Sequence, residues 1–345
     1  MSAGIGADAR VSRFERRAMG SPLRFALVGA TDAEARRAWA IVDAEIEAAE
    51  EALSRYRETS DLTRANRAAR REPGLAHWVE VDLRLRRALV AADRAGRRTD
   101  GRFDARVLAD LERLGSVGVA QSATRTQEPA DAAGIVDPRP SIDRHARWLW
   151  VDGRRPRVQL GTPVDLGGIG KGLALRWAWR RFHRATRPGI GAMLDAGGDV
   201  VVRGPSPDGG PWSIGIEDPR NEGEHVAVLA IEDGAVATSS VIVNRWRAPD
   251  GRLVHHLIDP ATGEPGGLGL LAVTVAGPDP AWAEVWSKTL FLAGSAGIAD
   301  AARSRGLAAW WVTVDGELSM TAAARMRTAW EPDPRRTRPP APQVG

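Results

Sequence analysis

Four glycines around a lysine, in the middle of the chain, are residue types that can bind an anionic group. Residues 165–172 read DLGGIGKG; an apolar stretch leads into them and a helical pattern follows. Glycines let the backbone bend sharply and bring N–H groups close to a ligand, and the N-terminus of a helix attracts negative charge. The run therefore suits a phosphate. It is not a P-loop, because Asp165 stands where that motif has its first glycine and Gly172 replaces its Ser or Thr.

Lysine is rare in this chain. The sequence has 48 lysines and arginines together, and only Lys171 and Lys288 are lysines. A compact ammonium fits beside an oxyanion where the planar fork of arginine does not. We interpret Lys171 as a phosphate-binding side chain, and the alternative is that two lysines remain by chance.

A polar turn follows a predicted helix over residues 81–95. Residues 99–104 read TDGRFD, which places Phe103 between two carboxylates, one of them Asp104. Gly and Asp favour turns, so this segment is either the edge of a ligand site or an ordinary turn after a helix.

Hydrophobic patterns predict the elements that carry these residues. A strand region over residues 14–28 is interrupted at Met19, and a helix over residues 32–53 has Asp32 as its candidate cap. Two short strands over residues 192–204 and a helix over residues 280–292 follow the glycine run. We expect a domain over residues 14–328, a flexible N-terminus (1–13), a loop with little fixed structure (115–145) and a disordered tail rich in Pro and Arg (329–345).

Composition narrows the class of protein. The 345 residues, 43% of them hydrophobic, can build a sizeable core, and the lack of cysteine excludes disulfides, thiolate zinc sites and a cysteine nucleophile. No apolar stretch reaches the ~18 residues needed to span a bilayer, and the N-terminus lacks the pattern of a signal peptide. We therefore expect a cytoplasmic protein without a membrane span.

The charge balance does not favour nucleic acid. The 44 acidic residues offset most of the 48 basic ones, which leaves a formal net charge of +4. The basic residues are scattered through helical stretches rather than gathered in one stripe with aromatics, so we expect no nucleic-acid partner.

Six spaced motifs occur together in the order that is typical of one family, and a seventh matches with changes. They are residues 19–21 (MGS), 54–66 (SRYRETSDLTRAN), 100–104 (DGRFD), 165–172 (DLGGIGKG), 197–199 (GGD) and 255–263 (HHLIDPATG), with 283–291 (AEVWSKTLF) as the seventh. Over about residues 14–325 the chain resembles the ApbE-type flavin transferases, the FAD:protein FMN transferases. The resemblance implies an α+β fold in a single large domain, with a mixed β-sheet core and flanking helices.

The resemblance also implies an activity. Enzymes of this family cleave the pyrophosphate of FAD, release AMP and leave FMN esterified through its phosphate to a Ser or Thr hydroxyl of a target flavoprotein. Phosphoryl transfer requires positioning and positive charge around the phosphates, which a glycine-rich turn, Lys171 and a metal ion can supply. A hydroxyl nucleophile also needs a base or a metal ion that helps it to lose its proton.

The resemblance also implies which residues contact FAD. Tyr56 would pack against a ring system, and Asp104 and Asp165 would accept hydrogen bonds from the nucleotide. His256 is the candidate for proton transfer near the phosphates, and the alternative is a histidine satisfied at the end of a strand. Arg102 stands where a small residue is common in the family. The contact positions are Met19, Tyr56, Arg102, Phe103, Asp104, Asp165, Lys171 and Ile258.

The seventh motif departs from the family at its metal site. Family members usually hold Mg²⁺ with an Asp, a Thr four residues later and the backbone carbonyl at the position of Gly168, whereas this chain has Glu284 and Lys288. Glutamate can bind Mg²⁺, but a protonated lysine cannot. Three accounts stay open: Lys288 supplies the missing positive charge, the metal site has decayed and the protein only holds flavin, or the two side chains form a structural helix pair at i, i+4.

We therefore expect an FMN transferase with His256, Glu284 and Lys288 as its catalytic residues, FAD as substrate, and Gly168 and Glu284 as the remaining ligands for an Mg²⁺ ion whose binding is in doubt. The alternatives are a non-catalytic FAD-binding protein of the same fold and an FAD pyrophosphatase that passes FMN to water.

Overall fold

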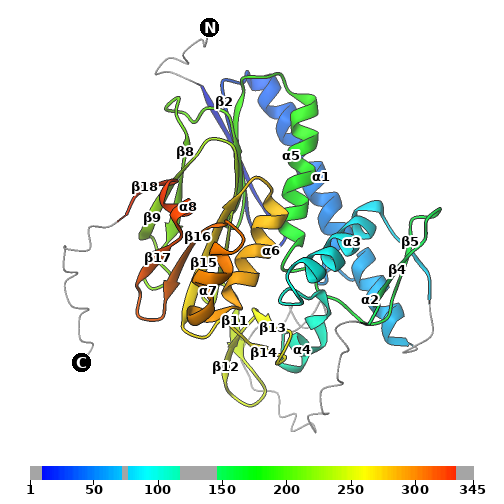
Figure 1. The fold of residues 1–345 in the computed structure, drawn as a ribbon. Coiled ribbons are helices and arrows are strands. Elements are labelled where there is room, and N and C mark those ends of the chain that lie inside the picture. The colour runs from blue at the N-terminus through cyan, green and yellow to red at the C-terminus, as the bar shows by residue number, and fades with distance from the viewer. Residues whose placement is uncertain (1–9, 72–76, 117–145, 332–345) are drawn as a thin grey trace.

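A large antiparallel sheet runs through the centre of the molecule (Figure 1). The computed structural model describes residues 10–71, 77–116 and 146–331. In spatial order the strands of this sheet are β1 (Val11–Ala18), β2 (Ser21–Val28), β6 (Gly191–Ala196), β7 (Asp199–Arg203), β10 (Gly234–Ser240), β15 (Leu270–Gly277), β16 (Ala308–Thr313) and β17 (Leu318–Met320). All their pairings are antiparallel.

The two faces of the sheet bury different layers, as the period of two along a strand requires. On β2, Leu23, Phe25 and Leu27 point toward α1 (Asp32–Leu53) and α5 (Gly170–Ala185). Ala26 and Val28 point the other way, toward a small sheet that covers the opposite face. Its strands are β8 (Trp212–Glu217), β9 (His225–Ile231) and β18 (Thr328–Trp330). The expected α+β class is thus confirmed as a central sheet between helices and a second sheet (Figure 1).

A second core lies beyond α1, where the helices α2 (Asp61–Arg71) and α3 (Leu83–Arg98) pack on a three-stranded sheet. The strands of that sheet are β3 (Val79–Glu80), β5 (Arg157–Leu160) and β4 (Leu149–Val151). The same core contains apolar residues of the glycine run, such as Leu166 and Ile169, and Val285 of helix α6 (Pro280–Phe291). The glycine run is therefore fixed between the two cores.

Helix ends follow their capping residues more closely than the hydrophobic pattern. Thr31, not Asp32, caps α1: its side chain accepts the N–H of Glu34, whose carboxylate accepts the N–H of Thr31. Helix α3 begins after the cap Asp82 and continues past Gly96 to Arg98. The pattern placed both helices correctly and their ends only approximately.

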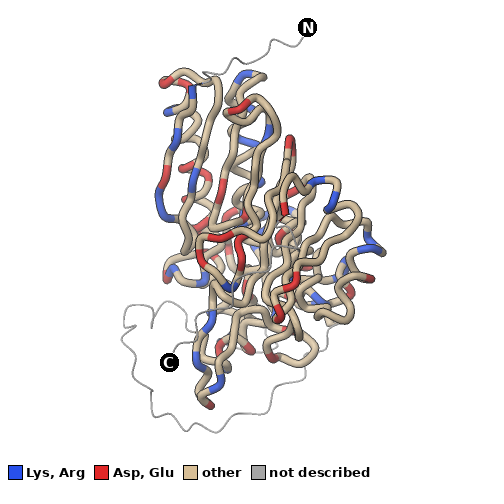
Figure 2. The backbone as a smooth tube through the Cα atoms, turned by 90° about the vertical axis from the view of Figure 1, so that its left-hand side faces the viewer, with Lys and Arg blue, Asp and Glu red and all other residues tan. Residues whose placement is uncertain are grey.

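The remaining elements are short, and most of them lie in the lower half of Figure 1. They are η1 (Ala105–Val107), α4 (Leu108–Arg113), β11 (Arg245–Arg247), β12 (Leu253–His255), β13 (Ile258–Asp259), β14 (Glu264–Pro265), α7 (Gly294–Arg303) and α8 (Ala322–Arg325). Figure 2 shows acidic and basic residues interspersed along the described chain, and many of them form ion pairs with one another.

The described domain is slightly longer than residues 14–328, because β1 begins at Val11 and β18 pairs with β9 up to Trp330. The expectations for residues 1–9, for most of the loop 115–145 and for residues 332–345 lie outside the described residues. Among the helices that the structure describes, none combines the length and the apolar character needed to cross a bilayer.

Candidate functional site

Two tight turns lie side by side at one end of the central sheet. Met19 and Gly20 join β1 to β2, and Gly197 and Gly198 join β6 to β7; the turns are neighbours because β2 pairs with β6. All four residues have positive φ, at 51°, 78°, 67° and 93°, as a two-residue hairpin of type I′ requires. Met19 adopts a conformation that a residue with a Cβ rarely takes, which makes this position unusual.

The second turn leads to a buried carboxylate that pairs with the first of the two lysines. Asp199 directly follows Gly198, and its Oδ2 lies 2.5 Å from Nζ of Lys171 in the first turn of α5. Burial opposes the charged ammonium, but Asp199 and then Glu284 outweigh it and raise the pKa of Lys171. The lysine is therefore a fixed positive charge at a helix N-terminus, where an anion is also favoured by the backbone N–H groups.

The glycine run is held by Asp165. Its Oδ1 accepts the N–H of Gly167 at 2.8 Å, and its Oδ2 lies 2.7 Å from Nε of Arg55 in an ion pair that is almost fully buried. The N–H of Asp165 donates to the carbonyl of Ala105, which ties the run to the segment after Phe103. Sequence reasoning gave Asp165 a ligand contact and did not foresee that Arg55 binds it.

Helices α5 and α6 meet at Gly172, side by side in Figure 1. A Cβ at this position would lie 2.5 Å from Cα of Ala281 and 2.6 Å from the carbonyl oxygen of Pro280, so no larger residue fits without moving a helix. The backbone N–H of Gly172 donates to Oε2 of Glu284 at 2.7 Å. This close approach brings the two side chains of the altered motif next to the glycine run.

Glu284 is a buried carboxyl that caps α5. Only 5% of it is exposed, and Oε1 has no hydrogen-bond partner among the described residues. Burial, helped by the nearby charge of Asp199, raises the pKa of Glu284 to about 8. Burial thus favours the protonated form of this carboxyl.

Lys288 follows Glu284 by one helical turn and is also buried, with 8% exposed. Its Cδ and Nζ lie 2.8 and 3.1 Å from the point where a Cβ on Gly168 would stand, beside Phe103. Burial lowers the pKa of Lys288, although Asp165 and Glu284 oppose that shift. Both side chains are buried and, within the described part of the chain, no ion pair joins them, so they are not an exposed ion pair on a helix surface.

These residues do not fit a magnesium site. Mg²⁺ takes oxygen ligands, and of the positions that would hold it only Glu284 and the carbonyl of Gly168 provide oxygen. The third position is Lys288, whose ammonium has no lone pair to donate while it is protonated. In residues 10–71, 77–116 and 146–331, no group of three or more His, Asp or Glu is arranged to hold a metal ion.

Tyr56 lies over the guanidinium that binds Asp165. The Tyr56 ring centroid is 4.3 Å from Cζ of Arg55, and Nη2 of Arg55 donates to its hydroxyl at 2.6 Å. About half of Tyr56, 53%, is exposed, so this aromatic residue lies at the protein surface. Arg55 therefore positions both an aspartate and an aromatic ring.

The turn that contains Phe103 is partly engaged within the protein. Phe103 is buried, with its ring edge 3.0 Å from the Cβ point of Gly168, and Arg102 is exposed. Asp104 caps η1 and binds Arg106 through both carboxylate oxygens, the shorter ion-pair distance being 2.8 Å. A ligand that hydrogen-bonds to Asp104 has to share it with Arg106.

His256 directly follows β12, and Ile258 begins β13. His256 is half-buried, its Nδ1 lies 3.3 Å from the carbonyl oxygen of Asn244, and burial together with the charge of Lys288 lowers its pKa to about 3. Its imidazole is thus neutral in the free protein. Ile258 is fully buried in an apolar cluster with residues such as Val107 and Val254, so its side chain belongs to the core.

The structure therefore brings most of the candidate residues to one end of the sheet, between α5 and α6. Lys171 and Glu284 meet at the start of α5, Lys288 and Phe103 meet at Gly168, and Arg55 links Asp165 to Tyr56. The side chains of Ile258 and Arg102 do not join these contacts. Sequence reasoning missed two ion-pair partners, Arg55 and Asp199, although both belong to motifs that the sequence shows. The available signal was that each is a charged residue within such a motif.

Comparisons with known proteins point to one family. The family model described as "ApbE family" matches residues 19–311. The FAD:protein FMN transferase of Klebsiella pneumoniae (strain 342) is 29% identical over 304 residues, which cover 87% of this chain and 83% of that protein. The FAD:protein FMN transferase of Salmonella typhimurium is 29% identical over 313 residues, covering 88% of this chain and 84% of that protein.

Solved structures agree with these relatives. The crystal structure of the ApbE protein from Thermotoga maritima superimposes with a TM-score of 0.75 at 25% identity, covering 92% of this chain and 99% of that one. The apo form of the Pseudomonas stutzeri flavinyl transferase ApbE gives a TM-score of 0.74, also at 25% identity, covering 92% and 97%. With its sequence motifs, its fold and its relatives in agreement, the chain belongs to the ApbE family.

Proposed function

We propose that this protein is an FAD:protein FMN transferase, which cleaves FAD to AMP and attaches FMN through its phosphate to a Ser or Thr hydroxyl of a target flavoprotein. The observation that carries the proposal is the start of α5. There the charged Lys171 and the glycine run stand at the positive end of the helix dipole, where a pyrophosphate would bind.

The other candidate residues suit the rest of the dinucleotide. The half-exposed Tyr56 offers an aromatic ring for a ring system, Met19 and Phe103 offer apolar contacts, and Asp104 and Asp165 offer hydrogen-bond acceptors. Arg102 is an exposed cation at the edge of this region, and Ile258 contributes through the backbone and core around it. Each of these assignments belongs to the proposal.

The transfer step balances without another reactant. The acceptor oxygen forms a bond to the phosphorus of the FMN half, the bond from that phosphorus to the bridging oxygen breaks, and AMP leaves with the electron pair. The hydroxyl proton passes to the neutral imidazole of His256, whose basicity rises when the anionic pyrophosphate is bound nearby. Glu284 acts by position, because its bond to Gly172 fixes the N–H groups of α5.

The test uses the purified protein, FAD and a candidate acceptor flavoprotein with a Ser or Thr at its flavin site. We expect AMP release that depends on the acceptor, together with flavin fluorescence that stays on the denatured acceptor. AMP release without covalent flavin would identify an FAD pyrophosphatase instead. Tight FAD binding with no AMP under any condition would leave a non-catalytic FAD-binding protein.

The matched variant is Lys171→Met, which removes the ammonium and keeps most of the side-chain volume. Loss of one positive charge at a transferring phosphate typically costs about 10²-fold or more in rate. Arg94→Met on the exposed side of α3 is the control, because Arg94 lies outside the contacts described above. Equal AMP release by Lys171→Met and the wild type would remove the main support for this proposal.

A further inference from the structure

Lys288 is a buried cation placed against the glycine run without a carboxylate to neutralise it. Among the residues that the structure describes, it forms no ion pair, whereas Lys171 has Asp199 at 2.5 Å. The nearest acids are already committed: Asp165 is paired with Arg55, and Glu284 accepts from Gly172. Burial of an ammonium without a partner is costly, so its retention calls for an anion that arrives from outside.

The backbone around Lys288 leaves space for its side chain beside the glycine run. Gly168 leaves room for it, because a Cβ there would stand 2.8 Å from Cδ and 3.1 Å from Nζ. The backbone of Gly168 is also where the resemblance places a metal ligand. A lysine side chain that fills this place repels a divalent cation by its charge and excludes it by its volume.

We infer that the ammonium of Lys288 takes the place of the divalent cation and binds the pyrophosphate of FAD directly, so that this chain transfers flavin without a metal. The inference rests on the proposed function. A lysine has the geometry for this role, since it offers a compact charge with three donors on a flexible stem. When the substrate binds, its two negative charges supply the partner that Lys288 lacks in the free protein.

A binding measurement tests the inference independently of catalysis. Mn²⁺, a spectroscopic substitute for Mg²⁺, is titrated into the FAD-saturated protein and followed by electron paramagnetic resonance. We expect no site-specific Mn²⁺ binding in the wild type beyond that of free FAD. The variant Lys288→Thr, which restores an oxygen ligand beside Glu284, is expected to bind Mn²⁺. Specific Mn²⁺ binding by the wild type would overturn the inference, whatever the activity of the protein.

Activity gives the second readout. We expect the wild type to release AMP at the same rate, within about twofold, in EDTA and in Mg²⁺. Lys288→Met should lose at least 10²-fold in both conditions, and Lys288→Thr should be active only in Mg²⁺. A wild type that stops in EDTA and recovers in Mg²⁺ refutes the inference and leaves the proposed function intact. No AMP release in either condition refutes the proposed function, and Mn²⁺ binding then decides the inference.

A thermal melt separates an electrostatic role from a structural one. Because Lys288 has no ion-pair partner among the residues that the structure describes, Lys288→Met should unfold at an equal or higher temperature than the wild type while its activity falls. Lower stability of Lys288→Met with full activity per folded molecule would show that the lysine serves the fold.

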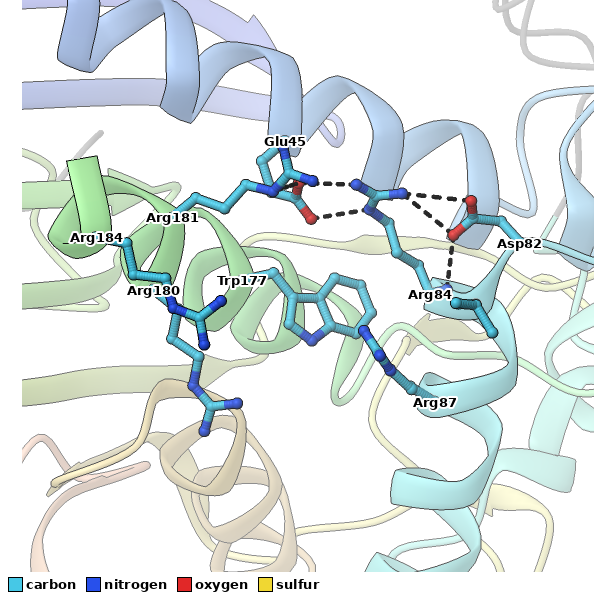
Figure 3. A pocket seen from close by; sticks show the side chains of 9 residues that line it. Glu45, Asp82, Arg84, Arg87, Trp177, Arg180, Arg181 and Arg184 are labelled. Atoms are coloured by element: carbon cyan, nitrogen blue, oxygen red, sulfur yellow. Dashed lines mark hydrogen bonds and ion pairs between the residues drawn. The ribbon is translucent and has the colours of Figure 1, made fainter. Parts of the chain in front are cut away.

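A different part of the molecule carries a second inference independently. Residues of helices α1, α3 and α5 and of the cap before α3 line an open concavity of about 500 Å³ (Figure 3), a size typical of small-molecule sites. It contains one indole, two acids and an excess of guanidinium groups. The lining residues are Glu45, Asp82, Leu83, Arg84, Arg87, Trp177, Arg180, Arg181 and Arg184.

The two acids neutralise only part of the positive charge. Glu45 binds Arg84 through two contacts of 2.8 Å and Arg181 at 2.7 Å, and Arg84 also reaches Asp82. In the described residues, the remaining three arginines form no ion pair; they are Arg87, Arg180 and Arg184. Figure 3 shows the ring of Trp177 between Arg180 on one side and Arg87 on the other.

We propose that this concavity binds a nucleoside polyphosphate, with the base on the half-buried indole of Trp177 and the phosphates on the three unpaired arginines. Guanidinium forks match phosphate oxygens, and an indole face is a stacking surface for a base. Arg180 and Arg184 repel each other at i, i+4 on α5, and a bound anion relieves that repulsion. The lining residues of α5 lie farther along the helix than Lys171, by 6 residues or roughly 9 Å at Trp177 and by 13 residues or roughly 20 Å at Arg184.

Calorimetry with ATP, inorganic tripolyphosphate and adenosine tests this site, since 13 tryptophans make indole fluorescence unspecific. The double variant Arg180→Glu, Arg184→Glu should weaken ATP and tripolyphosphate binding at least tenfold and leave FAD binding unchanged, and Trp177→Ala should weaken ATP binding only. Arg94→Glu, an exposed position on α3 outside the concavity, is the control. Equal binding of ATP by the double variant and the control would overturn the proposal.

Discussion

The contact of α5 with α6 at Gly172 allows a prediction with a matched control on the same helical turn. A Cβ at Gly172 would stand 2.5 to 2.7 Å from backbone atoms of Pro280 and Ala281. These atoms cannot move unless helix α6 moves with them. A Cβ at Gly170 would meet only Cβ of Leu166, at an ordinary 3.8 Å. Alanine is favoured over glycine in both positions by helix propensity, so only the contact differs.

The magnitudes follow from these distances. Replacement of glycine by alanine within a helix stabilises by about 0.5–1 kcal/mol, which is the whole effect expected for Gly170→Ala. Overpacking at Gly172 costs about 1–3 kcal/mol, and weakening of its N–H bond to Glu284 costs about 1 kcal/mol more. Gly172→Ala should therefore be destabilised by about 1–3 kcal/mol in net terms.

Urea unfolding of the two variants and the wild type measures the difference, and FAD binding reports on the site. We expect Gly172→Ala to lower both the midpoint of unfolding and the affinity for FAD, because Glu284 and Lys288 move with α6. Gly170→Ala should not lower the midpoint of unfolding. If both variants were equally stable, the close approach of the helices would not be what fixes the altered motif beside the glycine run.

Three further predictions concern single side chains. Glu284 has a pKa of about 8 when folded against an ordinary 4.5, so the folded state holds an extra proton between these values and stability falls as pH rises from about 4.5 to about 8. Glu284→Gln should flatten that decline and exceed the wild type in stability at pH 8, as urea unfolding at pH 5 and pH 8 will show; an unchanged decline would contradict it. Tyr56→Ala should bind FAD about fivefold more weakly than the wild type, which corresponds to a stacking energy of about 1 kcal/mol, and Tyr56→Phe should bind FAD within twofold of the wild type. Flavin fluorescence titration measures both affinities, and an equal loss in both variants would assign the effect to the hydroxyl. Glu45→Ala should destabilise the fold by about 2 kcal/mol, because it leaves Arg84 and Arg181 facing each other with no carboxylate between them. Glu45→Gln should destabilise the fold less. Thermal melts that show no loss for Glu45→Ala would mean that this ion-pair cluster contributes nothing to stability.

The elements of this fold are predictable where the sequence pattern is local. Residues 32–53 repeat apolar side chains at three and four, and α1 covers that range. The break at Met19 becomes a two-residue turn, and the glycine pair at 197–198 becomes another. The end of α3 was less predictable, because Gly96 lies inside the helix and the cap is the residue that follows Arg98. Local patterns give the body of an element better than its ends.

The candidate site was predictable as a set of segments and not as a set of contacts. The sequence shows that Glu284 and Lys288 are four residues apart, but that spacing is the same on a solvated helix and on a buried one. The burial of Glu284 and Lys288 depends on Gly172, which lies 112 residues before Glu284 in the sequence. Because Gly172 has no side chain, helices α5 and α6 can meet there. The pairing of Arg55 with Asp165 likewise joins segments that no local pattern connects.

The two lysines show how one residue type serves two electrostatic purposes at one site. Lys171 is neutralised within the protein by Asp199, so its charge is fixed before any ligand binds. Lys288 has no such partner in the described chain, so its charge is completed only by an anion that enters. A pyrophosphate bound between the two lysines would therefore gain more binding free energy from Lys288. Binding there removes the desolvation cost of a buried charge without a partner, a cost that Lys171 does not carry. We therefore expect the lysine of α6, rather than that of α5, to discriminate a bound dinucleotide from an empty site.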